Sequence, residues 1–195
     1  MLIIAFFLRV IPLRTSYWWD ETVYLQNSEV LFSSRTNYNE FDFRPPLLPI
    51  ILSLSYFIKH DLFTAKIIVA LLGILAPIFI FLIGKEILNL RVGLIAGLLM
   101  AFIPSIVENS GYIMTDIPSI SLLIISIYFL ILAQKRQSKT HYLFSGIFIS
   151  LSILMRFSSL IFLLLIPIYF YLNKKENNYY LSFIDFSYLA LGFII

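Results

Sequence analysis

The sequence contains no cysteine and only two histidines, His60 and His141. The lack of cysteine excludes disulfide bonds and thiolate metal sites, and two histidines far apart in the chain argue against a histidine-based zinc site. Charged residues make up 13% of the 195 residues, which is about half of what a soluble domain carries. The net charge is only +3, and the basic residues are scattered over several loops. Both facts argue against a nucleic-acid partner.

Hydrophobic residues dominate instead, at 60% of the chain with a mean hydropathy of +0.92. Apolar segments occupy residues 62–84, 92–107, 117–133, 142–155 and 157–172, with short polar linkers between them. Segments of this kind approach the roughly 20 residues that a spanning helix needs. We therefore expect an all-α integral membrane protein with about six spanning helices.

Both ends of the chain fall within apolar sequence. The first apolar run, 2–13, is interrupted by Arg9 and is shorter than a spanning helix, and the last run, 183–195, stops without a polar flank. We interpret residues 1–195 as the N-terminal part of a larger polytopic membrane protein, truncated at both ends.

The expected topology depends on the apolar segment 47–58. If it spanned the membrane, the basic loops near 85–91 and 135–139 would lie outside, against the positive-inside rule. If it lies along the interface, these loops and 174–175 are cytoplasmic and carry seven of the fourteen Lys and Arg residues. Eight of the eleven acids then lie outside: Asp20, Glu21, Glu29, Glu40, Asp42, Asp61, Glu108 and Asp116. We therefore expect a first outer loop at about 14–61 with one or two interfacial helices.

An acidic pair follows two tryptophans in this loop, in the stretch Tyr17-Trp18-Trp19-Asp20-Glu21-Thr22-Val23-Tyr24. Acids beside a bilayer are costly and persist mainly where they have a function, whereas Trp and Tyr favour the membrane–water boundary. Asp20 and Glu21 are therefore candidate functional acids at the outer boundary. The alternative is an aromatic belt beside two solvated acids.

Three further polar residues share the outer face in this topology: Arg44, Asp116 and Arg156. Asp116 could alternatively cap a helix whose early proline is Pro118, and Arg156 could instead extend to lipid headgroups. Two arginines can hold the phosphate of a lipid-linked donor as it leaves, while a carboxylate takes the proton of an incoming hydroxyl. A transporter would instead place such charges near helix midpoints.

Four motifs carry a resemblance to a known family. These are Trp19-Asp20-Glu21-Thr22-Val23-Tyr24, Arg44-Pro45-Pro46-Leu47, Met114-Thr115-Asp116-Ile117-Pro118 and Ser152-Ile153-Leu154-Met155-Arg156. The chain resembles polytopic GT-C-fold glycosyltransferases that use polyprenyl-phosphate-linked sugars, nearest to protein O-mannosyltransferases and lipid A aminoarabinose transferases. Their motifs are Asp-Glu-x-x-Tyr, basic-Pro-Pro-Leu, Thr-Asp-x-Pro and, most often, a lysine where this chain has Arg156.

The resemblance implies a role for each motif residue. Asp20 would be the base with Glu21 as its partner, Asp116 would be a second catalytic acid, and Arg44 and Arg156 would contact the donor phosphate. Tyr24 would belong to the substrate-binding residues.

The same resemblance implies what the protein works on and where. The donor would be a sugar on dolichyl or undecaprenyl phosphate, the acceptor a protein, lipid or glycan, and the reaction would occur on the extracytoplasmic side of the plasma membrane. No cofactor is assigned, and a divalent cation at the paired acids remains open. Members of this family are about twice as long as this chain or longer, so an inactive fragment remains an alternative beside the transporter.

Overall fold

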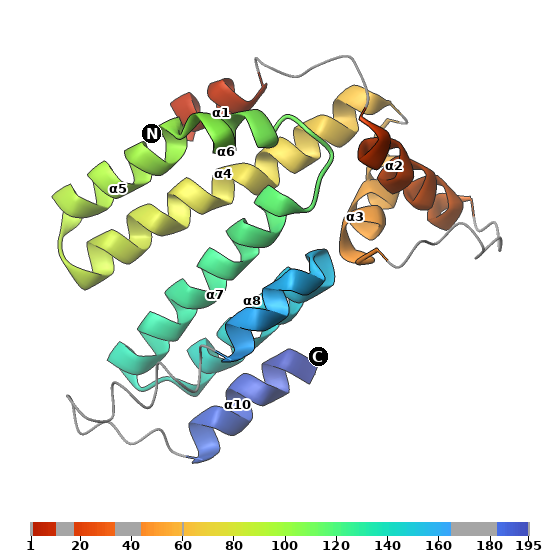
Figure 1. Cartoon of the computed structure of the whole chain (residues 1–195). Coiled ribbons are helices and arrows are strands. Elements are labelled where there is room, and N and C mark those ends of the chain that lie inside the picture. The colour runs from red at the N-terminus through yellow and green to blue at the C-terminus, as the bar shows by residue number, and fades with distance from the viewer. Residues whose placement is uncertain (1, 11–17, 34–43, 60, 165–182, 195) are drawn as a thin grey trace.

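The computed structural model describes residues 2–10, 18–33, 44–59, 61–164 and 183–194. Over this part of the chain the secondary structure is helical, with no strand. The elements are α1 (Leu2–Val10), α2 (Trp19–Phe32), α3 (Leu47–Ser55), α4 (Leu62–Ile87), α5 (Leu90–Phe102), α6 (Pro104–Asn109), α7 (Asp116–Arg136), α8 (Lys139–Met155), the 3₁₀ turn η2 (Phe157–Leu160) and α10 (Phe183–Ile194). Figure 1 shows their arrangement.

Two of the described helices are long and apolar enough to cross a membrane. They are α4 with 26 residues and α7 with 21, which correspond to lengths of about 39 and 32 Å against a hydrocarbon core of about 30 Å. The apolar helices α5 and α8 are shorter, with 13 and 17 residues. The expectation of an all-α membrane protein therefore agrees with the described part of the chain.

The segment expected as one helix over 92–107 is divided in two. Ile103 has an extended conformation, with φ −59° and ψ 114°, and separates α5 from α6. The cause is Pro104, because proline disfavours a helical conformation in the residue before it and is well suited to the first position of a new helix. The short helix α6 then leads into the loop 110–115, which precedes Asp116.

In the bundle α4 packs against α5 and α7, α7 against α8, and α8 against α10. The sequential pairs α4–α5 and α7–α8 are antiparallel, whereas α4 and α7 run in the same direction, as do α8 and α10 (Figure 1). A seam of serines joins α7 to α8. Ser126 Oγ donates to the Ser145 carbonyl at 2.8 Å and Ser145 Oγ donates back to the Ser126 carbonyl at 3.0 Å. One heptad along each helix, Ser152 Oγ donates to the Ser119 carbonyl at 2.9 Å. Small hydroxyl side chains of this kind let two helices in a membrane approach closely.

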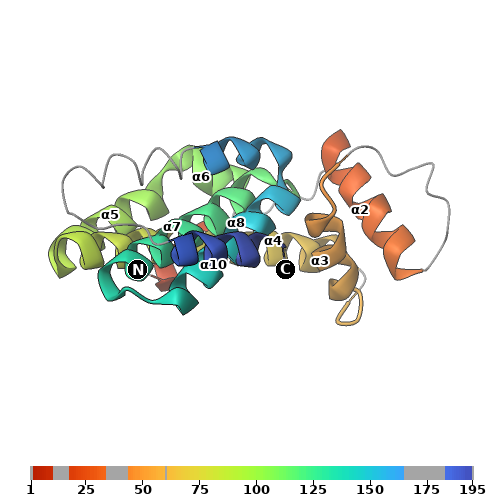
Figure 2. The ribbon, with the colours of Figure 1, turned by 90° about the horizontal axis from the view of Figure 1, so that it is seen from below.

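The helices α2 and α3 pack together across one end of this bundle, which the view from below also shows (Figure 2). Leu48 and Leu52 of α3 are fully buried, in one cluster with Ala65 and Val69 of α4. With nine residues, α3 is about 14 Å long and is too short to cross a bilayer. Its placement along the interface remains a prediction.

The turns joining α4 to α5 and α7 to α8 lie together at the opposite end (Figure 1). Lys85 and Arg91 flank the first turn, and Lys135, Arg136 and Lys139 flank the second. Asp20 and Asp116 belong to the end that carries α2 and α3. The bundle thus separates the basic turns from the end that holds Asp20 and Asp116. Which side of the membrane each end faces stays a prediction.

Candidate functional site

A cleft of about 410 Å³ lies where the starts of α2 and α7 and the end of α8 meet the start of α3. Charged residues from four separate segments line it: Asp20 from α2, Arg44 before α3, Asp116 at the start of α7 and Arg156 after α8. Tyr24, Pro45, Met114, Thr115, Phe157 and Ser158 complete the lining. The structure therefore brings together five of the six residues that the sequence singled out as candidates, from positions up to 136 residues apart.

Asp20 and Arg44 form an ion pair, with Arg44 Nη2 2.8 Å from Asp20 Oδ1. The guanidinium of Arg44 also lies over the ring of Tyr24, 5.1 Å from its centroid. Partial burial lowers the pKa of Arg44, but hydrogen bonds and charge attraction to Asp20 and Tyr24 outweigh this and raise its pKa overall. Arg44 is thus held as a cation at the cleft by one carboxylate and one aromatic face.

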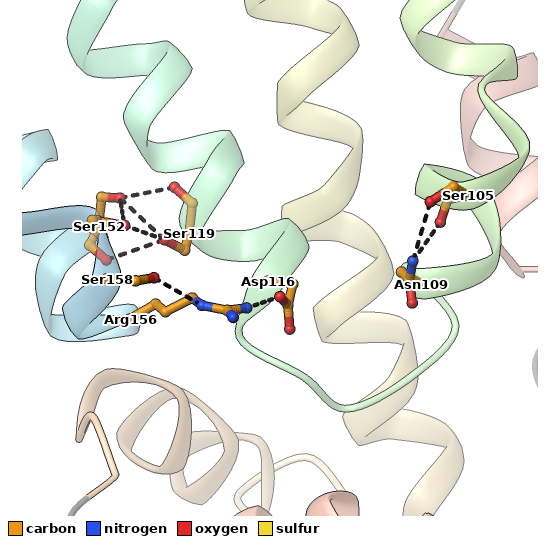
Figure 3. Close-up of polar contacts among 8 residues, drawn as sticks. Ser105, Asn109, Asp116, Ser119, Ser152, Arg156 and Ser158 are labelled. Carbon is orange, nitrogen blue, oxygen red and sulfur yellow. Dashed lines mark hydrogen bonds and ion pairs between the residues drawn. The ribbon is translucent and has the colours of Figure 1, made fainter. Parts of the chain in front are cut away.

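Asp116 and Arg156 form the second ion pair of the cleft, from Arg156 Nη1 to Asp116 Oδ1 (Figure 3). Arg156 Nε also donates to Ser158 Oγ at 3.0 Å. Asp116 is the first residue of α7 and its neighbour Thr115 occupies the cap position without a side-chain hydrogen bond. Asp116 and Arg156 thus pair with each other in the structure. The alternatives from the sequence were that Asp116 caps α7 and that Arg156 extends to lipid headgroups.

A buried cluster of serines supports the turn that carries Arg156. Ser119 Oγ of α7 lies 2.7 Å from Ser159 Oγ and 3.2 Å from Ser152 Oγ, and Ser152 Oγ donates to Ser159 Oγ at 3.1 Å (Figure 3). The cluster joins α7, the end of α8 and η2, because each of the three contributes one hydroxyl. Arg156 and Asp116 are therefore mounted on segments that hydrogen bonds fix to one another.

Glu21 was expected to accompany Asp20, but its carboxylate does not line the cleft. It is fully buried and accepts hydrogen bonds from the Trp18 N–H at 2.9 Å and the Ile113 N–H at 2.7 Å. Lys66 Nζ of α4 lies 3.5 Å from Glu21 Oε1 and is 1% exposed. Consecutive residues on a helix point about 100° apart, and here Asp20 faces the cleft while Glu21 points into the protein interior.

Lys66 was missed by the reading of the sequence, although a signal was present. It is the single charged residue in the apolar segment 62–84. A cation in such a segment normally has a buried partner, and here that partner comes from the first acidic motif. Lys66 and Glu21 therefore bind the α2 end of the site to the bundle.

Each of the two acids in the cleft forms an ion pair with an arginine, Asp20 with Arg44 and Asp116 with Arg156. Within the ranges that the structure describes, no group of three or more His, Asp or Glu side chains is arranged to hold a metal ion. The arrangement offers two cations for an anionic group and two carboxylates beside them, which suits a reaction in which a phosphate departs and a hydroxyl loses its proton.

Comparison with known families gives one match. A family model described as dolichyl-phosphate-mannose-protein mannosyltransferase matches residues 43–195. This range includes Arg44, Asp116 and Arg156 and begins after α2, so that it leaves out Asp20 and Glu21. Among curated proteins, none matches the chain.

Proposed function

Since the chain belongs to the dolichyl-phosphate-mannose-protein mannosyltransferase family, we propose that it transfers a sugar from a polyprenyl phosphate to an acceptor hydroxyl at the extracytoplasmic face of the membrane. The family makes it a glycosyltransferase of the mannosyltransferase type. The carrier lipid, the acceptor and the membrane side belong to the proposal.

The observation that carries this proposal is the pair of Asp–Arg contacts in one cleft, Asp20 with Arg44 and Asp116 with Arg156. In the proposed reaction Arg44 and Arg156 bind the phosphate of the donor. The acceptor oxygen forms a bond to the anomeric carbon as the bond from that carbon to the phosphate oxygen breaks. The phosphate departs with the electron pair, and the arginines stabilise its growing charge.

Asp20 is the proposed base, because it combines an exposed carboxylate with a position at the cleft. It takes the proton from the acceptor hydroxyl as the new bond forms. Asp116 is the proposed second acid and keeps Arg156 oriented across the cleft from Arg44. Tyr24 holds Arg44 through its ring and places the guanidinium for the donor.

Donor binding and base activation are coupled in this scheme. Before the donor binds, Arg44 is occupied by Asp20, in a pair whose side chains are 22% and 51% exposed. Such exposed pairs contribute only about 0.2–1 kcal/mol, so that separating this pair costs little. A donor phosphate can therefore displace Asp20 from Arg44 and leave the carboxylate available for the acceptor.

The rival class of function, a transporter, would place its charged side chains near helix midpoints. The four charged side chains of the cleft lie instead at or beyond helix ends. The basic turns at the opposite end of the bundle support an extracytoplasmic cleft through the positive-inside rule.

Reconstitution tests the proposed function. The full-length protein is placed in liposomes with sugar-labelled dolichyl-phosphate mannose or undecaprenyl-phosphate mannose, and with a Ser/Thr-rich peptide or a lipid-linked glycan as acceptor. We expect label to move from the carrier to an acceptor in the wild type and not in the Asp20→Asn Asp116→Asn double variant. The proposal is contradicted if the wild type and the double variant transfer sugar equally well. It is also contradicted if the folded wild type transfers no sugar from either carrier.

A further inference from the structure

We propose that Glu21 and Lys66 are positioning residues that set the distance between the two halves of the cleft, an inference that rests on the proposed function. Glu21 follows Asp20 directly, but its side chain is buried and turned away from the cleft. It connects three segments of the chain, and two of these carry the acids of the site.

The first connection lies within α2. The Glu21 carboxylate accepts the Trp18 N–H through Oε2 at 2.9 Å, which is half of a capping box. This contact fixes the first turn of α2, where Asp20 lies.

The second connection runs from α2 to the loop before α7. Glu21 Oε1 accepts the N–H of Ile113 at 2.7 Å, across 92 residues of sequence. Ile113 is fully buried and stands three residues before Asp116. The rings of Trp18 and Tyr112 join the same two segments, with centroids 5.9 Å apart. The carboxylate therefore holds the Asp20 side and the Asp116 side of the cleft at a set spacing.

The third connection anchors both segments to the bundle. Lys66 of α4 lies 3.5 Å from Glu21 Oε1, and the two side chains are 1% and 0% exposed. A buried ion pair is weak as a source of stability, because the cost of desolvating the ions offsets their attraction. Its geometry is nevertheless restrictive, since neither charge can move without losing its partner. A function in positioning explains a buried ion pair at this place better than stability does.

A distance measurement tests the proposal without any need for activity. Because the chain lacks cysteine, spin labels at Gln26→Cys on α2 and Ser105→Cys on α6 report one distance between two exposed positions. We expect a narrow distance distribution in the otherwise wild-type protein and a broad one after Glu21→Gln.

A second variant and a control accompany this measurement. Since removing one charge of a buried ion pair is destabilising, the double variant Glu21→Leu Lys66→Met, which removes both charges of the pair, is measured as well. Its distribution is expected to be broad too. The control is Glu86→Gln, which removes the carboxylate charge that pairs with Lys135 at the opposite end of the bundle and should leave the distribution narrow. An unchanged distribution in the folded Glu21→Gln and double variants overturns the proposal.

Cross-linking distinguishes positioning from a chemical role of Glu21. Trp18→Cys and Tyr112→Cys are joined by a short, reducible bis-methanethiosulfonate reagent in the Glu21→Gln background. A misplacement of about 1 Å can cost about 10²-fold in rate. We therefore expect the Glu21→Gln protein to transfer sugar about 10²-fold more slowly before cross-linking. Its rate should recover once the cross-link forms and fall again when the cross-link is reduced. Asp20→Asn in the same cross-linked protein should stay inactive.

The outcomes separate this inference from the proposed function. If Glu21→Gln stays inactive after cross-linking while the cross-linked Glu21-containing protein is active, Glu21 acts in the chemistry and the positioning role is refuted. If even the wild type transfers no sugar, the proposed function fails, and the spin-label distances alone decide whether Glu21 and Lys66 hold the cleft.

Discussion

In the Asp20→Asn variant the cleft keeps its shape but loses its proposed proton acceptor. Asparagine has the size of aspartate, and its amide oxygen can still accept a hydrogen bond from Arg44, which lies 2.8 Å from the carboxylate in the wild type. General base catalysis contributes about 10²–10⁴-fold to a rate. We therefore expect the turnover number to fall by this factor while the protein remains folded.

The affinity for the donor should respond in the opposite direction. In the proposed scheme the donor phosphate competes with Asp20 for Arg44, and an exposed pair of this kind is worth about 0.2–1 kcal/mol. Loss of the competing charge should leave donor affinity unchanged or raise it by at most about fivefold. Loss of turnover without loss of donor affinity is the result that assigns the base role to Asp20.

The assay measures both quantities on full-length protein in liposomes. Turnover comes from transfer of labelled sugar, and donor affinity comes from equilibrium binding of the labelled polyprenyl-phosphate sugar. Glu29→Gln is the matched control, because Glu29 is an exposed acid on the same helix outside the cleft lining. Wild-type turnover in Asp20→Asn would refute the reasoning, and so would an equal loss in Glu29→Gln.

Three further predictions concern the donor site, the bundle and the end of α4. Arg156→Gln should weaken donor binding by about 1.5–3 kcal/mol, the value of a charged hydrogen bond, as measured by the same binding assay. Gly93→Val should destabilise the packing of α5 on α4 by about 1–3 kcal/mol, seen as a lower Tm, because even a Cβ at this position would lie 2.5 Å from a backbone oxygen of α4. Hydrogen bonds from Lys59 and from Thr64 lower the pKa of Asp61 from 3.8 to about 2. The cap of α4 should therefore hold above pH 4 and fail as the pH falls through about 2, seen as faster hydrogen exchange at the Thr64 amide.

Each of these predictions has a clear contrary result. Donor affinity that is equal in Arg156→Gln and wild type would remove that arginine from the phosphate site, and Arg156→Lys serves as the charge-retaining control. An unchanged Tm in Gly93→Val would show that α4 and α5 can separate at no cost. Exchange at the Thr64 amide that is insensitive to pH between 4 and 2 would mean that the Asp61 carboxylate does not control this helix end.

Several features of this protein were readable from residue types and their order. The helical membrane character follows from apolar segments such as 62–84 and 117–133, because an apolar stretch in lipid must satisfy its own backbone hydrogen bonds. The family resemblance drawn from four short motifs is confirmed at the level of the family. The break at Ile103 was also within reach, since Pro104 is in the sequence, but the apolar run 92–107 masked it.

The contacts within the site were not readable in the same way. That Asp20 pairs with Arg44 and Asp116 with Arg156 depends on how α2, α3, α7 and α8 meet. Charge alone would permit the opposite pairing equally well. The cluster of Ser119, Ser152 and Ser159 that supports the turn with Arg156 likewise depends on the antiparallel register of α7 and α8.

The two neighbouring acids show most clearly what tertiary structure decides. The sequence by itself determined that Asp20 and Glu21 stand at the start of a polar segment, beside tryptophans and in a motif with Tyr24. Only the packed structure decided that Asp20 faces the cleft and that Glu21 is buried against Lys66. The physical reason is that adjacent residues on a helix point in different directions, so that only one of the two acids is buried here. The buried acid is Glu21, because Lys66 of α4 lies beside it and compensates its charge.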